Sequence, residues 1–272
     1  MFRRKLFWGL YALGLSIFLL YFFGQFLLAW AVEQMGESNV PVMGLRTTPT
    51  QLIEIFRRSL KLDGSGETYA NYFWFQGYMV MILLALAGSI LMGNDIHYGT
   101  LPFYLSKPLS RWQYLLGKCL AVGVFVNLMT TLPALVLFVQ WGLLDSWNFE
   151  LLPGILAYGL MLTILLSLML TATAAWLRRT VPMLMAWATL FLFFRLLARA
   201  MVEELKFDRH WRLIDLWNNA YLLGYYCLRN DMSRLYSTTQ PDIYLAGLVL
   251  VAVSLFCLLY LIHRIRGVEI VK

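Results

Sequence analysis

The sequence predicts an all-α membrane protein with six transmembrane helices, and three observations support this fold class. Of the 272 residues, 60% are hydrophobic and 14% are charged, whereas a soluble domain has roughly 45–50% apolar and about 25% charged residues. Several apolar runs exceed the roughly 20 residues that a helix needs to cross the hydrocarbon core of a bilayer. The basic residues lie beside the ends of these runs, which is typical of proteins oriented in a membrane.

We expect a single membrane domain over residues 1–272. Five runs without Asp, Glu, Lys or Arg, and one run with two arginines, predict spans at about residues 7–32, 70–93, 115–144, 153–177, 181–202 and 243–262. Transmembrane strands would be about 10 residues long and alternating, so the length of these runs favours helices. The first run is longer than the roughly 7–15 apolar residues of a signal peptide, which predicts an uncleaved span.

The distribution of charge predicts that both ends of the chain lie in the cytoplasm. If the N-terminus is inside, the short inner segments are rich in basic residues and poor in acids. The basic residues are Arg3, Arg4, Lys5, Lys107, Arg111, Lys118, Arg178, Arg179, Arg264, Arg266 and Lys272, and the acids are Asp95 and Glu269. This arrangement follows the positive-inside bias. The chain has a net charge of +7, but its basic residues form no face interleaved with exposed aromatic residues. We therefore expect no nucleic-acid partner.

Two outer segments are expected to lie on the membrane or to dip into it. Thr48–Gln51 reads as a capping box, and the helix after it places Leu52, Phe56 and Leu60 on one face. This pattern predicts an interfacial helix on membrane lipid after the first span; the alternative is a solvated helix packed on the spans. Leu216–Leu228 is free of charge but too short to cross, which predicts a re-entrant or interfacial element before the sixth span.

Aromatic residues are frequent in the second outer loop. The simplest interpretation is an aromatic belt at the membrane interface, and the alternative is a sugar-binding track. The residues are Trp211, Trp217, Tyr221, Tyr225, Tyr226, Tyr236 and Tyr244.

The fifth predicted span contains Arg195 and Arg199, which are four residues apart and therefore on one face of a helix. Charged residues inside a span are costly and often functional, so the pair is a candidate substrate path that would attract an anionic headgroup. The alternative is structural anchoring. Long side chains near a helix end reach the interface, and Glu203 is placed to pair with Arg199.

The inner turn between the second and third spans is dense in helix signals. Gly99 ends the outgoing helix, Thr100 caps a new one, and Pro102 fits its first turn. Pro108 ends this element within about two turns. We therefore expect a short helix along the membrane surface, tied at both ends to spans; the alternative is an ordinary polar hairpin.

The run NDIHYGTLPFYLSKPLSRWQYLLGK, residues 94–118, resembles the signature of permease subunits of type 2 ABC transporters. The matching residues are Asp95, Gly99, Thr100, Leu101, Ser106, Lys107, Pro108, Ser110, Arg111, Tyr114, Gly117 and Lys118. The resemblance implies that the short helix is a coupling helix that docks on a separate ATP-binding cassette ATPase. The implied contacts are Asp95, Tyr98, Gly99, Thr100, Leu101, Phe103, Tyr104, Leu105, Ser106, Lys107 and Arg111. Many relatives carry a longer amphipathic helix before the first span, whereas only about five residues precede it here. A second contact with the ATPase from the N-terminus is therefore not expected.

The resemblance further implies an exporter in a bacterial cytoplasmic (inner) membrane, with a second permease as homodimer or heterodimer partner. Gly117–Lys118 is followed by Cys119 rather than by the Ser or Thr of a P-loop, so ATP and Mg²⁺ belong in the partner ATPase. We expect a non-catalytic subunit without a bound cofactor or metal. The main alternative is a mechanotransmitter that drives an extracytoplasmic partner protein without carrying a substrate, and a third is a channel or anchor that needs no ATPase.

Overall fold

The structure, a computed structural model, describes residues 9, 11–12, 14–24, 26, 40–42, 45–47, 64–88, 111–144, 147–177, 179–232 and 239–264. The apolar helix Gly14–Gly24 comes first. The named α-helices are α3 (Gly66–Gly88), α6 (Arg111–Met129), α7 (Thr131–Leu144), α8 (Leu151–Leu177), α9 (Thr180–Ala188), α10 (Phe194–Arg199), α11 (Leu216–Cys227) and α12 (Ile243–Arg264). The other elements are the π-helical segments η2 (Thr189–Phe193) and η3 (Ala200–Glu204), the 3-10 helix η4 (Arg209–Ile214), and strands β1 (Val40–Val42) and β2 (Leu45–Thr47).

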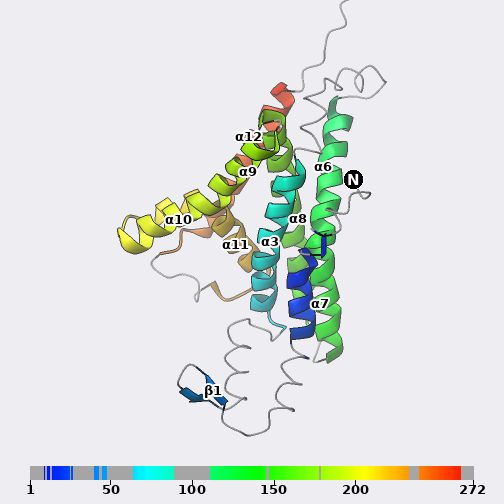
Figure 1. Ribbon diagram of the computed structural model, residues 1–272, viewed down its shortest axis with the longest axis vertical. Coiled ribbons are helices and arrows are strands. Elements are labelled where there is room, and N and C mark those ends of the chain that lie inside the picture. The colour runs from blue at the N-terminus through cyan, green and yellow to red at the C-terminus, as the bar shows by residue number, and fades with distance from the viewer. Residues whose placement is uncertain are drawn as a thin grey trace, which may run out of the picture.

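Helices α6 and α7 follow one another end to end, and this long helix runs alongside α3 and α8 to form a bundle (Figure 1). Helix α8 is central, because it contacts α3, α6, α7, α11 and α12. Its buried face includes Leu162 and Leu166, both fully covered. We call the end of the bundle that holds Leu177 and Arg264 the upper end, and the end that holds Gly66 the lower end, as in Figure 1.

Among the described residues, four helices are long and apolar enough to cross a membrane: Trp112–Leu143, Leu151–Leu177, Val181–Glu204 and Ile243–Arg264. They correspond to the third to sixth predicted spans. Helix α3 lies in the second predicted span, but Asn71, Gln76 and its tyrosines make it less apolar. The described part of the first predicted span is the shorter helix Gly14–Gly24. The helical fold is thus confirmed, whereas the number of six spans stays a prediction.

One short hairpin lies in the predicted first outer loop of this otherwise helical fold. Strands β1 and β2 pair antiparallel, with Val40 opposite Thr47 and Val42 opposite Leu45. β-Branched residues at three of these positions favour extended backbone. The interfacial helix predicted after Thr48–Gln51 lies outside the described residues.

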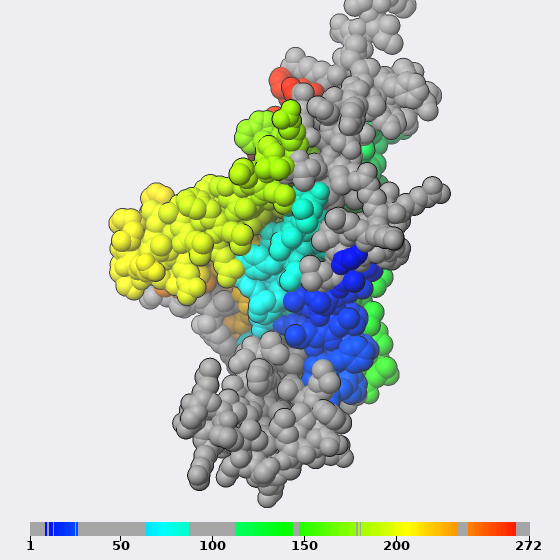
Figure 2. All heavy atoms as spheres, viewed as in Figure 1, coloured from blue at the N-terminus to red at the C-terminus, as the bar shows by residue number. Residues whose placement is uncertain are grey.

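The fifth span forms an arm, residues 181–204, that leaves the bundle obliquely and projects from the body of the molecule (Figures 1 and 2). In its most apolar stretch 22% of the residues are buried inside the molecule, against 61% in α8. Two π-helical segments, η2 and η3, flank α10 within the arm. Such segments insert an extra residue per turn and are frequent at functional sites. They bracket the part of the arm that carries both arginines.

A buried glutamine joins three helices at the middle of the bundle. Pro133 has no backbone N–H, so the carbonyl of Met129, four residues earlier, lacks its usual helical donor. Gln76 Nε2 on α3 donates to this carbonyl at 2.8 Å and to the Gly14 carbonyl at 2.8 Å. At the break between α6 and α7, a side chain from a neighbouring helix thus supplies the hydrogen bond that the backbone carbonyl lacks. Backbone polar groups in apolar surroundings require such a partner.

Helix α11 coincides with the short charge-free segment that the sequence singled out. The structure confirms a helix there, packed against α3, α8 and α12. Trp217 is fully buried and Tyr225 nearly so, which makes the predicted interface belt wrong for these two residues. They belong to the core because α11 is covered on several sides. Trp211 and Tyr244 are exposed, as a belt requires.

Candidate functional site

The residues predicted to dock on an ATPase lie in the chain between α3 and α6. Asp95, Tyr98, Gly99, Thr100, Leu101, Phe103, Tyr104, Leu105, Ser106 and Lys107 fall outside the described residues, and Arg111 is the first residue of α6. Helix α3 ends at Gly88. The end of α3 and the start of α6 both lie toward the upper end of the bundle (Figure 1). The docking role of these residues stays a prediction.

The described residues at the upper end carry several cations. Arg179, in the turn between α8 and α9, is exposed, and so is Arg264 at the end of α12. Lys118 lies on the first turns of α6 with its Nζ 5.7 Å from the centre of the Tyr114 ring. Exposed cations beside the ends of apolar helices are the pattern expected of a cytoplasmic membrane surface.

The predicted arginine pair lines a cavity between the arm and the bundle. The cavity has a volume of about 330 Å³, and α3, α10, η3, η4 and α11 contribute its walls. The lining residues are Asn71, Trp74, Phe75, Arg195, Arg199, Glu203, Arg212, Asp215, Asn218 and Tyr221. Three of them are cationic and two are acidic, and aromatic rings form much of the rest.

Arg195 is half-buried and lies against aromatic rings of α3. Its guanidinium carbon is 4.7 Å from the Trp74 ring centre and 5.2 Å from that of Tyr78. Its Nη1 donates to the Tyr78 hydroxyl. A guanidinium over ring faces gains cation–π attraction, which is larger where water is excluded. These contacts fix Arg195 at the junction between the arm and α3.

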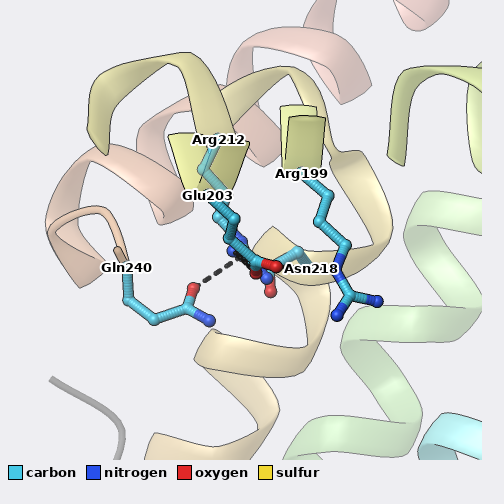
Figure 3. Close-up of polar contacts among 5 residues, drawn as sticks. All are labelled: Arg199, Glu203, Arg212, Asn218 and Gln240. Atoms are coloured by element: carbon cyan, nitrogen blue, oxygen red, sulfur yellow. Dashed lines mark hydrogen bonds and ion pairs between the residues drawn. The ribbon is translucent and has the colours of Figure 1, made fainter. Parts of the chain in front are cut away.

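Glu203 links the two other arginines of the cavity. Arg199 Nε donates to Glu203 Oε2 at 2.7 Å, and Arg212 Nη1 donates to Glu203 Oε1 at 2.9 Å. Figure 3 shows these side chains beside Asn218, whose Nδ2 donates to Gln240 Oε1 at 3.0 Å. The predicted pairing of Glu203 with Arg199 is therefore confirmed. This bridge supports the anchoring interpretation for Arg199 and leaves its two terminal nitrogens directed away from Glu203.

Asp215 closes the cavity at the start of α11. It is 3% exposed and accepts a hydrogen bond from the Asn218 backbone N–H at 3.0 Å, as an N-cap residue does. Burial raises the pKa of this carboxyl, while the cap hydrogen bonds and the nearby Arg195 and Arg212 oppose the rise. The cap holds α11 against the cavity wall.

Several residues of the cavity were not identified from the sequence. Arg212 and Asp215 lie in the predicted second outer loop, and Asn71 and Trp74 lie in the second predicted span, far from the arm in sequence. A polar residue such as Asn71 inside an apolar run is a signal that could have marked α3. The convergence of these five elements follows from tertiary packing alone.

The described part of the chain contains no group of three or more His, Cys, Asp or Glu side chains that could hold a metal ion. Cys119, Cys227 and Cys257 are free thiols. The cavity instead presents guanidinium and amide donors, which suit an anionic ligand.

Comparison with known proteins gives one family. A family model described as ABC-2 family transporter protein matches residues 65–207, just over half of the chain. The match begins at α3, contains the motif of residues 94–118 and includes the whole arm, whereas Arg212 and α11 lie beyond it. No curated protein and no solved structure matches the chain. The family match and the helices long enough to cross a membrane together show that this multi-pass membrane permease belongs to the ABC-2 transporter family.

Proposed function

We propose that this chain is the membrane-spanning subunit of an ATP-driven exporter, powered by a separate ATP-binding cassette ATPase. The observation that carries the proposal is that the motif of residues 94–118 lies inside the family match over residues 65–207. Membership of the family implies pairing with an ATPase of this class. The chain itself is then non-catalytic, with ATP and Mg²⁺ bound by the partner.

Force from the ATPase enters through the segment between α3 and α6. Because this segment joins Gly88 to Arg111, a displacement of it acts on both helices. Helix α3 contacts α9 of the arm, and α6 contacts the central helix α8. Closing of the ATPases on ATP would thus shift the arm and the bundle relative to each other. A substrate path would open between two permeases, in a homodimer or heterodimer, with Arg195 and Arg199 as its candidate contacts.

We place the upper end of the bundle at the cytoplasmic face of a bacterial inner membrane, with both termini inside. The exposed Arg179 and Arg264 at that end support this orientation through the positive-inside bias. The lower end, with hairpin β1–β2 in its loop, then faces outward.

The docking role is tested by substituting Gly99→Pro and Leu101→Asp in the full-length permease, co-expressed with the ATP-binding protein encoded beside it. A proline at 99 breaks the start of the short helix, and a carboxylate at 101 places charge in an apolar groove. We expect the amount of ATPase that co-purifies with each variant to be about tenfold lower than with the wild type, or lower still. The reason is that a few central residues contribute most of the binding energy of an interface.

Arg179→Gln is the matched control, since Arg179 is exposed at the same end of the bundle but outside the segment. It should retain the ATPase at the wild-type level. Full retention of the ATPase by both Gly99→Pro and Leu101→Asp would refute the docking role. Failure of the wild-type permease to retain any ATPase would favour a channel or membrane anchor.

The alternative is a mechanotransmitter that drives an outer partner protein. It is favoured by the described part of the predicted second outer loop, where α11 packs on α3 and α8 and η4 packs on α10 and α11. ATP-dependent flux through vesicles that contain the permease and the ATPase alone would exclude this alternative.

A further inference from the structure

Two cavities follow one another along the seam between α3 and the arm. The first is the arginine-lined cavity. The second has a volume of about 140 Å³ and lies further toward the upper end. It is lined by Tyr78, Met81, Ile82 and Ala85 of α3 and by Leu184, Trp187, Ala188, Phe191 and Leu192 of the arm. Since Arg195 of the first cavity bonds Tyr78 of the second, this pair marks the boundary between them.

The seam is therefore charged at one end and apolar at the other. On α3 the lining passes from Asn71 to Ala85, a rise of about 21 Å at 1.5 Å per residue. The antiparallel arm passes over the same stretch from Arg199 to Leu184. A lipid has a polar headgroup followed by a hydrocarbon chain, so its polar and apolar parts follow the same order as those of the seam. Its length is also comparable to that of the seam.

The charged end of the seam has hydrogen-bond donors that are not used within the protein. Arg199 bonds Glu203 through Nε, Arg212 through Nη1, and Arg195 uses Nη1 for Tyr78. Among the described residues, the remaining guanidinium nitrogens of these three arginines have no further hydrogen-bond partner in the structure. Their charges exceed those of Glu203 and Asp215 by one unit, and burial favours the neutral form of Asp215. The cavity is thus built to receive an anion.

A phosphate group fits this arrangement best. The planar fork of a guanidinium donates two parallel hydrogen bonds to phosphate or carboxylate oxygens, and charge-assisted bonds of this kind are strong. A cation inside a span is costly unless it is paired, so an anion bound at Arg195 and Arg199 also offsets the cost of placing them in the arm. The Trp74 and Tyr221 rings border the cavity and would cover the glycerol region of a lipid.

We propose that the seam binds a phosphate-bearing amphiphile, with its phosphate at Arg195, Arg199 and Arg212 and one hydrocarbon chain along the apolar cavity toward Ala188. Such binding is independent of ATP-driven export and requires no ATPase. It assigns a ligand class to Arg195 and Arg199, the candidate contacts of the proposed substrate path.

The test is native mass spectrometry of the detergent-purified full-length permease, which gives the affinity for the first bound ligand. Three ligands separate the sources of recognition: dioleoyl phosphatidylglycerol, dioleoylglycerol without the phosphate, and glycerophosphate without the chains. Phosphatidylglycerol should bind at least about tenfold more tightly than either of the others, because each lacks one of the two recognised parts. Equal affinity for dioleoylglycerol would overturn phosphate recognition, and equal affinity for glycerophosphate would overturn the apolar half of the site.

The double variant Arg195→Gln/Arg199→Gln should lower the affinity for phosphatidylglycerol about tenfold or more. Its matched control is Arg229→Gln, since Arg229 is an exposed arginine that bonds Glu150 away from the seam. The control should bind as the wild type does. Wild-type affinity in the double variant would overturn the proposal.

A second variant keeps the proposal testable where the double variant fails to fold. Ala188→Phe places a ring in the apolar cavity without altering any charge. It should lower the affinity for phosphatidylglycerol and leave that for glycerophosphate unchanged. An unchanged affinity for phosphatidylglycerol would contradict the placement of the chain.

Discussion

At the scale of single residues, buried amides take the place of missing backbone bonds. Gln76 is fully buried and serves the carbonyl that Pro133 leaves without a donor, while Gln140 Nε2 donates to the Phe22 carbonyl at 2.8 Å. Both amides tie the N-terminal helix Gly14–Gly24 to the bundle. In an apolar solvent an unpaired carbonyl costs several kcal/mol, roughly 2–7 by transfer measurements, so these positions constrain the packing of the first helix.

This arrangement predicts a coupling between Gln76 and Pro133. Gln76→Leu should lower the free energy of unfolding by about 1 kcal/mol, which is typical for a hydrogen bond between membrane helices. Pro133→Ala restores the N–H that bonds the Met129 carbonyl within the helix, so the cost of Gln76→Leu should shrink in that background. A double-mutant cycle of unfolding in detergent measures this interaction.

Gln140→Leu serves as the control for the cycle, because Gln140 bonds Phe22 rather than Met129. It should cost the same with Pro133 or with alanine at 133. An equal cost of Gln76→Leu in both backgrounds would show that the missing N–H of Pro133 is unrelated to the role of Gln76.

The contacts of some of these residues could be predicted from the sequence, and the contacts of others could not. The pairing of Arg199 with Glu203 followed from their spacing of four residues, because neighbours on one helix are set by local geometry. Gln76 and Asn71 are polar residues within an apolar run, but their partners come from segments distant in sequence. The position of Arg212 on the same carboxylate depends on where η4 packs, which spacing does not encode.

At the scale of elements, α11 is held against the bundle by close contacts at glycine. A Cβ at Gly224 of α11 would overlap the Tyr158 ring of α8, and one at Gly77 of α3 would overlap the Trp217 ring of α11. These two contacts bring α11 against helices on both sides and explain why Trp217 is buried rather than part of an interface belt. The charge-free run predicted the element, and the glycines determine how closely it packs.

Gly224→Ala should therefore destabilise the protein by about 1–3 kcal/mol, the usual cost of overpacking a core. Gly117→Ala is the control, because no atom lies within 4 Å of a Cβ added there and alanine favours a helix. Thermal melting in detergent should show a lower transition temperature for the first variant and no loss for the second. A melting temperature for Gly224→Ala at or above the wild-type value would contradict the close packing of α11 on α8.

At the scale of the whole molecule, the helical class and the third to sixth spans were predictable because apolar runs of about 20 residues and the placement of charge report directly on the bilayer. The oblique course of the arm was not predictable, since a hydrophobic run fixes the length of a helix but not its tilt. The hairpin β1–β2 is too short to leave a strong pattern. The arginine cavity exists because the arm, α3 and the outer loop meet, and that meeting is a property of the fold.

The central claim is that this permease exchanges force with an ATPase through the segment between α3 and α6. The most direct measurement is the ATP hydrolysis rate of the partner ATPase in proteoliposomes, with wild-type permease, Leu101→Asp or Arg179→Gln. We predict that the wild type and Arg179→Gln change the ATPase rate to the same extent relative to ATPase alone, and that Leu101→Asp returns it to the rate of ATPase alone. An ATPase rate unaffected by the wild-type permease, or affected equally by Leu101→Asp, would contradict the claim.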